Sequence, residues 1–234
     1  MGGRAKASGR PASVEPVLET GPGSVPKSTL EPYPLDYGAR ELEWLSSRDP
    51  IMGERIARVG HIRRMVDPDP FRALSLQVVG QQISNAALAT VWSRVVARTA
   101  GLGGFSTDSV LALGQDGLAS CGMSGRKASY VMGIATAVES GSCDLADLRD
   151  LPDADVISRL TTLRGVGTWT AEMFLIFSLG RLDVLAMDDL GIRNGMRRLY
   201  HHREVTPAIF ERHRRRYSPY GTVASLYLWE AAQG

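Results

Sequence analysis

The amino-acid sequence predicts an all-α fold, and three observations support this. Almost every segment after residue 34 places apolar residues at the spacing of one helix face. Helix starts recur in which a side-chain oxygen can accept from free backbone amides, several of them just before a proline. The sequence has no alternating run of β-branched residues flanked by hairpin turn pairs. We therefore expect roughly ten short helices packed into a globule.

The expected helices begin at capping residues along the chain. Asp69 and Pro70 begin one helix, Ser84 begins the next, and Ser124 begins a long one that ends at Gly141. The later helices are expected to begin at Asp153, Thr168, Asp188, Thr206 and Ser218. Short loops join all of these segments, so we expect them to pack closely.

Composition indicates an ordinary globular protein. The chain has 234 residues, of which 44% are hydrophobic and 22% charged, which excludes fibrous and collagen-like classes. Its longest unbroken apolar run, Met173 to Phe177, is far shorter than a membrane span requires. Two cysteines, Cys121 and Cys143, are too few for a disulfide framework. We expect a flexible tail over residues 1–34, one domain over 35–234, and a cytoplasmic location.

Charge is unevenly distributed, although the net charge is only +2. The segment 191–217 carries eight arginines against two glutamates, whereas 141–162 carries five aspartates against two arginines. The basic segment could face a polyanion, or it could be a solvated arginine-rich helix. The four histidines form no recognisable constellation, and we expect them at the surface.

The most informative stretch is LTTLRGVGTWTAEMFLIF, residues 160–177. Gly165 and Gly167 bracket Val166 between two expected helices, and Thr168 is expected to cap the second. Glycines let a turn approach a ligand closely, and free amides at a helix start can bind a phosphate oxygen. This is the helix-hairpin-helix pattern, although a glycine-rich turn between core helices would have the same three residues.

Two adjacent aspartates, Asp188 and Asp189, begin the helix that follows. Only one is needed as a cap, so the other is free to project. A carboxylate at a helix N-terminus is held ionised by the helix dipole and can stabilise a developing positive charge or activate a water. A double cap without chemistry is the alternative.

This order of motifs resembles the helix-hairpin-helix DNA glycosylases, and in its closing helix the 3-methyladenine branch. The similar segments are VVGQQISNAALATVW (78–92), MSGRKASYVMGIA (123–135) and YSPYGTVASLYLWE (217–230). The resemblance implies two interleaved helical lobes with a DNA cleft between them. One lobe would span about 70–183, and the other 36–69 together with 184–234.

Bifunctional members of this family carry a lysine two residues after the second hairpin glycine, where this chain has Trp169. The resemblance therefore implies a monofunctional enzyme without lyase activity. It would flip out and excise alkylated purines of the 3-methyladenine and 7-methylguanine type from duplex DNA, leaving an abasic site for base excision repair. A glycosylase for deaminated or etheno bases, or a non-catalytic DNA-binding protein, remains an alternative.

The resemblance also implies roles for individual residues. Asp189 would be the catalytic carboxylate that stabilises the sugar cation. Trp169 and Trp229 would hold the cationic base, with Met173 in the same pocket. Gln81, Gln82 and Ile83 would form the loop that enters DNA, with Gln82 filling the gap, unless a glutamine here only supports a helix turn. The hairpin residues expected to contact DNA are Arg164, Gly165, Val166, Gly167 and Thr168.

The resemblance implies that no cofactor is required. By resemblance, the backbone carbonyls of Thr161, Leu163 and Val166 could hold a Na⁺ or K⁺ ion at the hairpin. The C-terminal region has no cysteines, so we expect no iron–sulfur cluster. The expected partner is duplex DNA containing alkylated bases. We expect a monomer that does not bind membranes and that is associated with the nucleoid in a bacterium or found in the nucleus of a eukaryote.

Overall fold

The computed structural model describes residues 31–233, and this part of the chain is mainly helical. The helices of the first half are α1 (Ala39–Arg48), α2 (Pro50–Val59), α3 (Pro70–Gly80), α4 (Asn85–Ala100), α5 (Thr107–Ala119) and α6 (Gly125–Glu139). Those of the second half are the 3-10 helix η1 (Asp147–Asp150), α7 (Asp153–Leu160), α8 (Thr168–Phe177), α9 (Leu190–Leu199), α10 (Pro207–Tyr217) and α11 (Gly221–Gln233). The all-α prediction is confirmed, with one small sheet as an exception.

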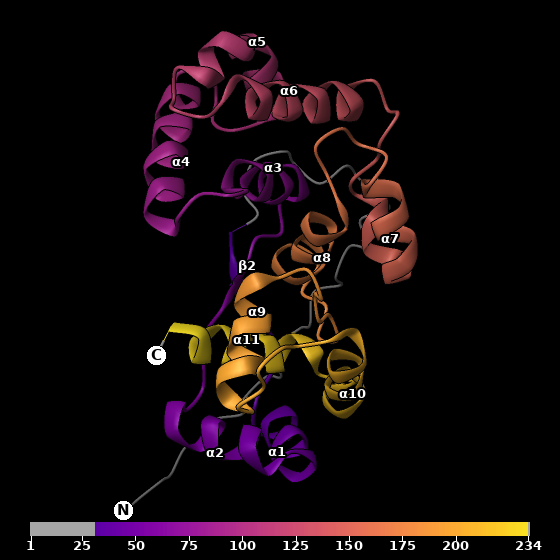
Figure 1. Ribbon diagram of the computed structural model, residues 1–234. Coiled ribbons are helices and arrows are strands. Elements are labelled where there is room, and N and C mark those ends of the chain that lie inside the picture. Colours follow the sequence, from indigo (N-terminus) through magenta and orange to yellow (C-terminus); the bar gives the residue numbers. More distant parts are fainter. Residues whose placement is uncertain (1–30, 234) are drawn as a thin grey trace, which may run out of the picture.

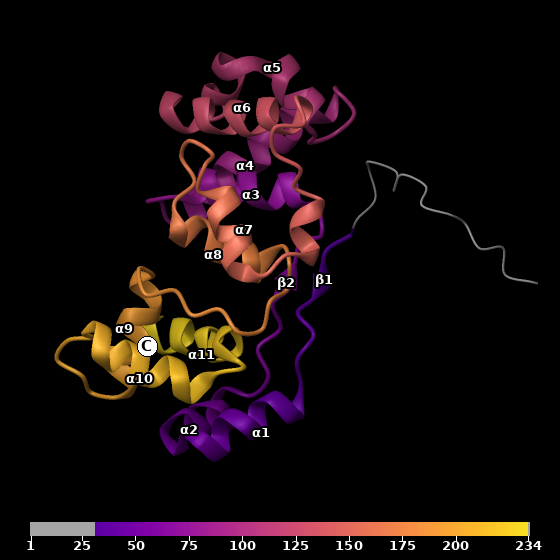
Figure 2. The same ribbon diagram turned by 90° about the vertical axis from the view of Figure 1, so that its right-hand side faces the viewer.

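That sheet pairs β1 (Tyr33–Pro34) with β2 (Met65–Val66) in antiparallel register. The two short strands run side by side between the upper and lower helices (Figure 2). The expected tail ended at residue 34, so its last residues are paired here, while residues 1–30 lie outside the described part. Two-residue strands carry too little alternation to be recognised in sequence.

Several predicted caps are confirmed and others are wrong: Asp153 is the first residue of α7 and not its cap, and Ser218 ends α10, while α11 begins only at Gly221. The side chains of Asp69, Ser84 and Ser124 accept hydrogen bonds from backbone amides at the starts of α3, α4 and α6. Thr168 does not cap α8, because Gly167 occupies the cap position and no side chain accepts there. Asp189, and not Asp188, caps α9.

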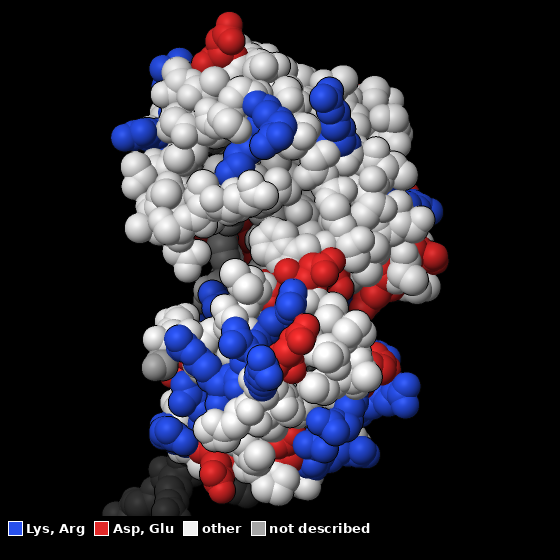
Figure 3. All heavy atoms as spheres, in the orientation of Figure 1, with Lys and Arg blue, Asp and Glu red and all other residues white. Residues whose placement is uncertain are grey.

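The helices form two groups (Figure 1). Helices α3 to α8 pack with one another in the upper group, and α1, α2 and α9 to α11 pack with one another in the lower group. The lower group thus contains both the first and the last helices of the described chain, and the upper group contains the helices between them. The surface narrows at the level where the two groups meet (Figure 3).

Apolar side chains fill the interior, but the lower group also contains a buried polar network. Tyr200 donates to Asp49 at 3.0 Å and accepts from Tyr217 at 2.7 Å, while Arg216 pairs with the same Asp49 carboxylate at 2.9 Å. His213 is only 2% exposed, so the expectation of a surface position for it is wrong. No helix within residues 31–233 is long and apolar enough to cross a membrane.

Candidate functional site

Asp189 lies at the junction of the two groups, where the loop after α8 enters α9. Its side chain is 7% exposed, and Oδ1 accepts from the backbone amide of Ile192 at 2.8 Å. Asp188 is exposed. From the sequence we expected one aspartate as the cap and the other as the projecting carboxylate. Asp189 has both roles, because its carboxylate caps α9 and also faces α8 and α11.

Two indole groups donate to this carboxylate. Trp169 Nε1, from the first turn of α8, lies 2.9 Å from Asp189 Oδ2. Trp229 Nε1, from α11, lies 2.9 Å from Asp189 Oδ1. An ionised carboxylate has only acceptor sites, so it can satisfy all three N–H donors at once. The site therefore holds a buried anion between two half-buried aromatic rings.

Gly191 makes this arrangement possible, and sequence reasoning did not identify it. A Cβ at residue 191 would lie 2.7 Å from Trp229 Cδ1 and 3.1 Å from Asp189 Oδ1. The first distance is below any real contact, so only glycine lets the indole reach the carboxylate. Phe177 stacks on Trp229 with ring centroids 5.8 Å apart, and this contact helps to hold the indole in place.

Met173 and Glu172 continue α8 beyond Trp169. Met173, expected in the base pocket, is 2% exposed and belongs to the hydrophobic core. Burial, together with the nearby charges of Asp188 and Asp189, raises the pKa of Glu172 to about 7. Glu172 was not identified from sequence, although a lone carboxylate in the apolar segment TWTAEMFLIF was a signal.

The hairpin is a tight turn supported from α6. Val166 is buried, and its amide donates to the carbonyl of Leu163 at 3.0 Å. Gly165 has a φ of 90°, and a Cβ there would overlap the ring of Tyr130. The Arg164 guanidinium lies 5.9 Å from the centre of that ring. Both the left-handed backbone and the close approach of Tyr130 require glycine at 165.

The outer side of the hairpin is open. Arg164, Gly167 and Thr168 are exposed, and no atom lies within 4 Å of where a Gly167 Cβ would be. The first amides of α8 have no side-chain cap. Unlike Gly165, Gly167 is therefore not required by any contact within the described residues.

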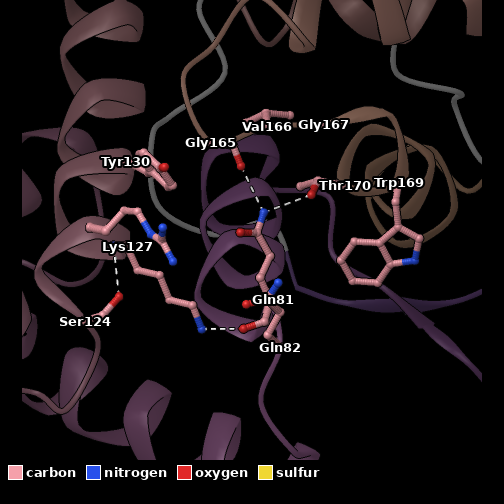
Figure 4. Close-up of a pocket in the computed structure, with 11 residues that line it drawn as sticks. Gln81, Gln82, Ser124, Lys127, Tyr130, Gly165, Val166, Gly167, Trp169 and Thr170 are labelled. Atoms are coloured by element: carbon pink, nitrogen blue, oxygen red, sulfur yellow. Dashed lines mark hydrogen bonds between the residues drawn. The ribbon is translucent and has the colours of Figure 1, made fainter. Parts of the chain in front are cut away.

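A pocket of about 540 Å³ separates the hairpin from the start of α6 and the loop after α3 (Figure 4). Gln81 Nε2 donates to the carbonyl of Gly165 at 2.9 Å and to Thr170 Oγ1 at 3.0 Å. Gln82 has a φ of 56° and is exposed, and Ile83 is 39% exposed. Gln81 thus supports the hairpin, while Gln82 and Ile83 form the accessible tip of the loop.

The arginine-rich segment is partly neutralised by local ion pairs. Arg214 and Arg215 both pair with Glu211, and Arg216 pairs with the buried Asp49. Lys and Arg side chains still gather on the lower half of the face in Figure 3, and further ones lie on its upper half. Among residues 31–233, no group of three or more His, Cys, Asp or Glu side chains is placed to hold a metal ion.

Comparison with known proteins matches this geometry to one family. A model described as HhH-GPD superfamily base excision DNA repair protein matches residues 77–219. DNA-3-methyladenine glycosylase 1 of Schizosaccharomyces pombe is 33% identical over 174 residues, which cover 73% of this chain and 76% of that protein.

Two solved structures extend the match to the whole fold. The 3-methyladenine DNA glycosylase of Schizosaccharomyces pombe in complex with abasic DNA has a TM-score of 0.75 at 30% identity, covering 84% of this chain and 98% of that one. The DNA-3-methyladenine glycosidase of Bacillus halodurans has a TM-score of 0.72 at 33% identity, covering 87% and 93%. The chain therefore belongs to the HhH-GPD superfamily of base excision DNA repair proteins.

Proposed function

We propose that this protein is a monofunctional DNA glycosylase that excises alkylated purines, of the 3-methyladenine and 7-methylguanine type, from duplex DNA and leaves an abasic site. The observation that carries this proposal is the Asp189 carboxylate held between the indoles of Trp169 and Trp229 at 2.9 Å each. Relatives named as 3-methyladenine glycosylases support the same substrate class.

The chemistry of an alkylated purine suits this site. Methylation of a ring nitrogen makes the base cationic, so it is already a good leaving group and requires no strong general acid. Aromatic faces attract a cationic base. The carboxylate of Asp189 stabilises the positive charge that develops on the sugar as the glycosidic bond breaks, and a water then adds to the sugar.

The absence of an amine at position 169 supports hydrolysis without strand cleavage. A lyase reaction requires a nucleophilic amine that attacks the sugar carbon and forms a Schiff base. The Trp169 side chain cannot do so, and its Nε1 is already bonded to Asp189. The expected product is therefore an intact strand with an abasic site.

The exposed edge of the hairpin would bind the DNA backbone. The uncapped amides at the start of α8 can donate to a phosphate, and the space beside Gly167 lets a phosphate approach without a Cβ in the way. Gln82 and Ile83, both exposed, would enter the duplex where the base leaves, with Gln82 filling the gap. Gln81 would act indirectly, through its bonds to the hairpin.

The hairpin carbonyls of Thr161, Leu163 and Val166 would hold a monovalent cation, Na⁺ or K⁺, which would supply a positive charge for binding the DNA backbone. The Leu163 carbonyl accepts one hydrogen bond, from Val166, and keeps a second lone pair for a cation. The donor set, neutral carbonyl oxygens, suits such an ion. Replacing K⁺ with a bulky organic cation at equal ionic strength should then weaken DNA binding.

The test is base release from methylated duplex DNA by wild type and by Asp189→Asn, with free base and strand breaks followed separately. Release of methylated purines without strand breaks, lost in the variant, is the expected result. Strand cleavage by the wild type would contradict the monofunctional assignment. Tight DNA binding without release of methylated, deaminated or etheno bases would instead indicate a binding protein.

A further inference from the structure

Lys127 is a basic residue near the hairpin whose side chain turns inward. It lies in the first turn of α6, and its Nζ donates to the backbone carbonyl of Val79 at 2.8 Å. The same Nζ donates to the backbone carbonyl of Gln81 at 2.5 Å (Figure 4). These carbonyls lie at the C-terminal end of α3, where a helix has carbonyls without partners and carries a partial negative charge. The ammonium group therefore acts as a charged cap on α3.

Gln81 is held at two points because its side chain is also fixed. Its backbone carbonyl accepts from Lys127, while its amide Nε2 donates to Gly165 O and Thr170 Oγ1. Helices α3, α6 and α8 are thus joined through one residue. The next two residues form the tip of the loop: Gln82 has a left-handed backbone, and Ile83 is partly exposed, with its amide donating to Gly80 O at 3.4 Å.

We propose that Lys127 is a positioning residue for DNA insertion: by bonding the end of α3, it aims the Gln82–Ile83 tip relative to the hairpin without contacting DNA itself. This inference rests on the proposed function. A tip that must enter a base stack requires a rigid base, since displacement by about 1 Å can reduce a rate about 100-fold. Burial and the adjacent charge of Arg126 lower the pKa of Lys127, as expected for an ammonium used inside the protein.

The test compares Lys127→Met, which keeps the stem but removes the donors, with Arg126→Met. Arg126 is an exposed neighbour that lines the same pocket. Single-turnover excision is measured on a methylated purine in a fully paired duplex and on one in a one-nucleotide bulge. In the bulge no base lies opposite the purine, so flipping breaks no base pair and leaves no gap for the tip to fill. Binding is measured over a range of salt concentrations.

Lys127→Met should reduce excision from the paired duplex by about 10- to 100-fold and from the bulge by less than about threefold. Its salt dependence of binding should equal that of wild type, whereas removing a phosphate contact lowers the slope by about 0.9. Lys127→Arg, which keeps a positive charge and N–H donors on a long stem, should restore most of the lost rate. Equal losses on both substrates, or a reduced slope for Lys127→Met, would overturn the proposal.

A second readout is independent of base release. 2-Aminopurine placed opposite a stable abasic analogue brightens when a protein tip enters the duplex and unstacks it. Wild type and Arg126→Met should produce this rise, and Lys127→Met should bind without producing it. If Lys127→Met fails to fold, Gln81→Met provides a second test, because it removes the hydrogen bonds from Gln81 Nε2 to Gly165 and Thr170. Gln81→Met should show the same dependence on the substrate. If wild type inserts its tip but releases no base, only the proposed function fails.

Discussion

Adding one methyl group at Gly191 should separate the Trp229 indole from the Asp189 carboxylate. In Gly191→Ala the new Cβ would lie 2.7 Å from Trp229 Cδ1, whereas ordinary contacts begin at 3.4 Å. The ring must therefore move by about 0.7 Å, which stretches a 2.9 Å hydrogen bond beyond the usual limit of about 3.2 Å. The backbone at 191 imposes no further strain, because its φ lies outside the left-handed region.

A hydrogen bond to a charged group contributes about 1.5–3 kcal/mol. We expect Gly191→Ala to lower the free energy of unfolding by about 1–2 kcal/mol and the single-turnover rate of base release by about 10- to 100-fold. The measurements are denaturant unfolding and quenched-flow release of methylated base. DNA affinity should change little, since the hairpin is unaffected.

Gly133→Ala is the matched control. Gly133 lies inside α6, with no atom within 4 Å of the added Cβ. It should stabilise the protein by about 0.5–1 kcal/mol and leave base release unchanged. A wild-type rate for Gly191→Ala, with the protein folded, would refute the role assigned to the Trp229–Asp189 contact.

Three further changes test other parts of the molecule. Burial, followed by the charge of Arg216, lowers the pKa of His213 to about 4. Between pH 6.5 and 4 the unfolded state therefore binds more protons than the folded state, so the free energy of unfolding should fall by about 3 kcal/mol as the pH is lowered across this range. His213→Phe should remove this pH dependence of unfolding. The pKa of Glu172 is raised, so stability should fall as pH rises from 4.5 to 7, and Glu172→Gln should stabilise the protein at pH 8 but not at pH 4.5. Gly165→Ala should cost about 1–3 kcal/mol and weaken DNA binding in a filter assay, whereas an unchanged affinity would contradict the hairpin assignment.

Local sequence signals were sufficient for much of the fold. The helix starts at Asp69, Ser84 and Ser124 depend on one side chain and the amides directly after it, so they can be read from a few residues. Helix α8 does begin at Thr168, but Thr168 is its first residue and not its cap, because Gly167 occupies the cap position. Propensity alone does not distinguish these cases.

The site was less accessible to such reasoning. The resemblance pointed to Asp189, Trp169 and Trp229, which the structure brings together from three elements. It did not reveal that Asp189 is itself the cap, nor that Gly191 permits the contact. The cap is a local contact with the amide of Ile192, whereas the need for glycine at 191 depends on how α9 packs against α11, which no local pattern encodes.

Helix formation, the glycine hairpin and the aspartate at a helix start are specified by neighbouring residues and could be inferred from the order of the chain. Which side chains turn inward depends on packing between distant segments. The bonds that Lys127 and Gln81 make to α3, the hairpin and α8 exist only because those helices meet. Unpaired carbonyls at the end of a helix, brought within reach of a long cationic side chain, explain why the fold turns that side chain inward.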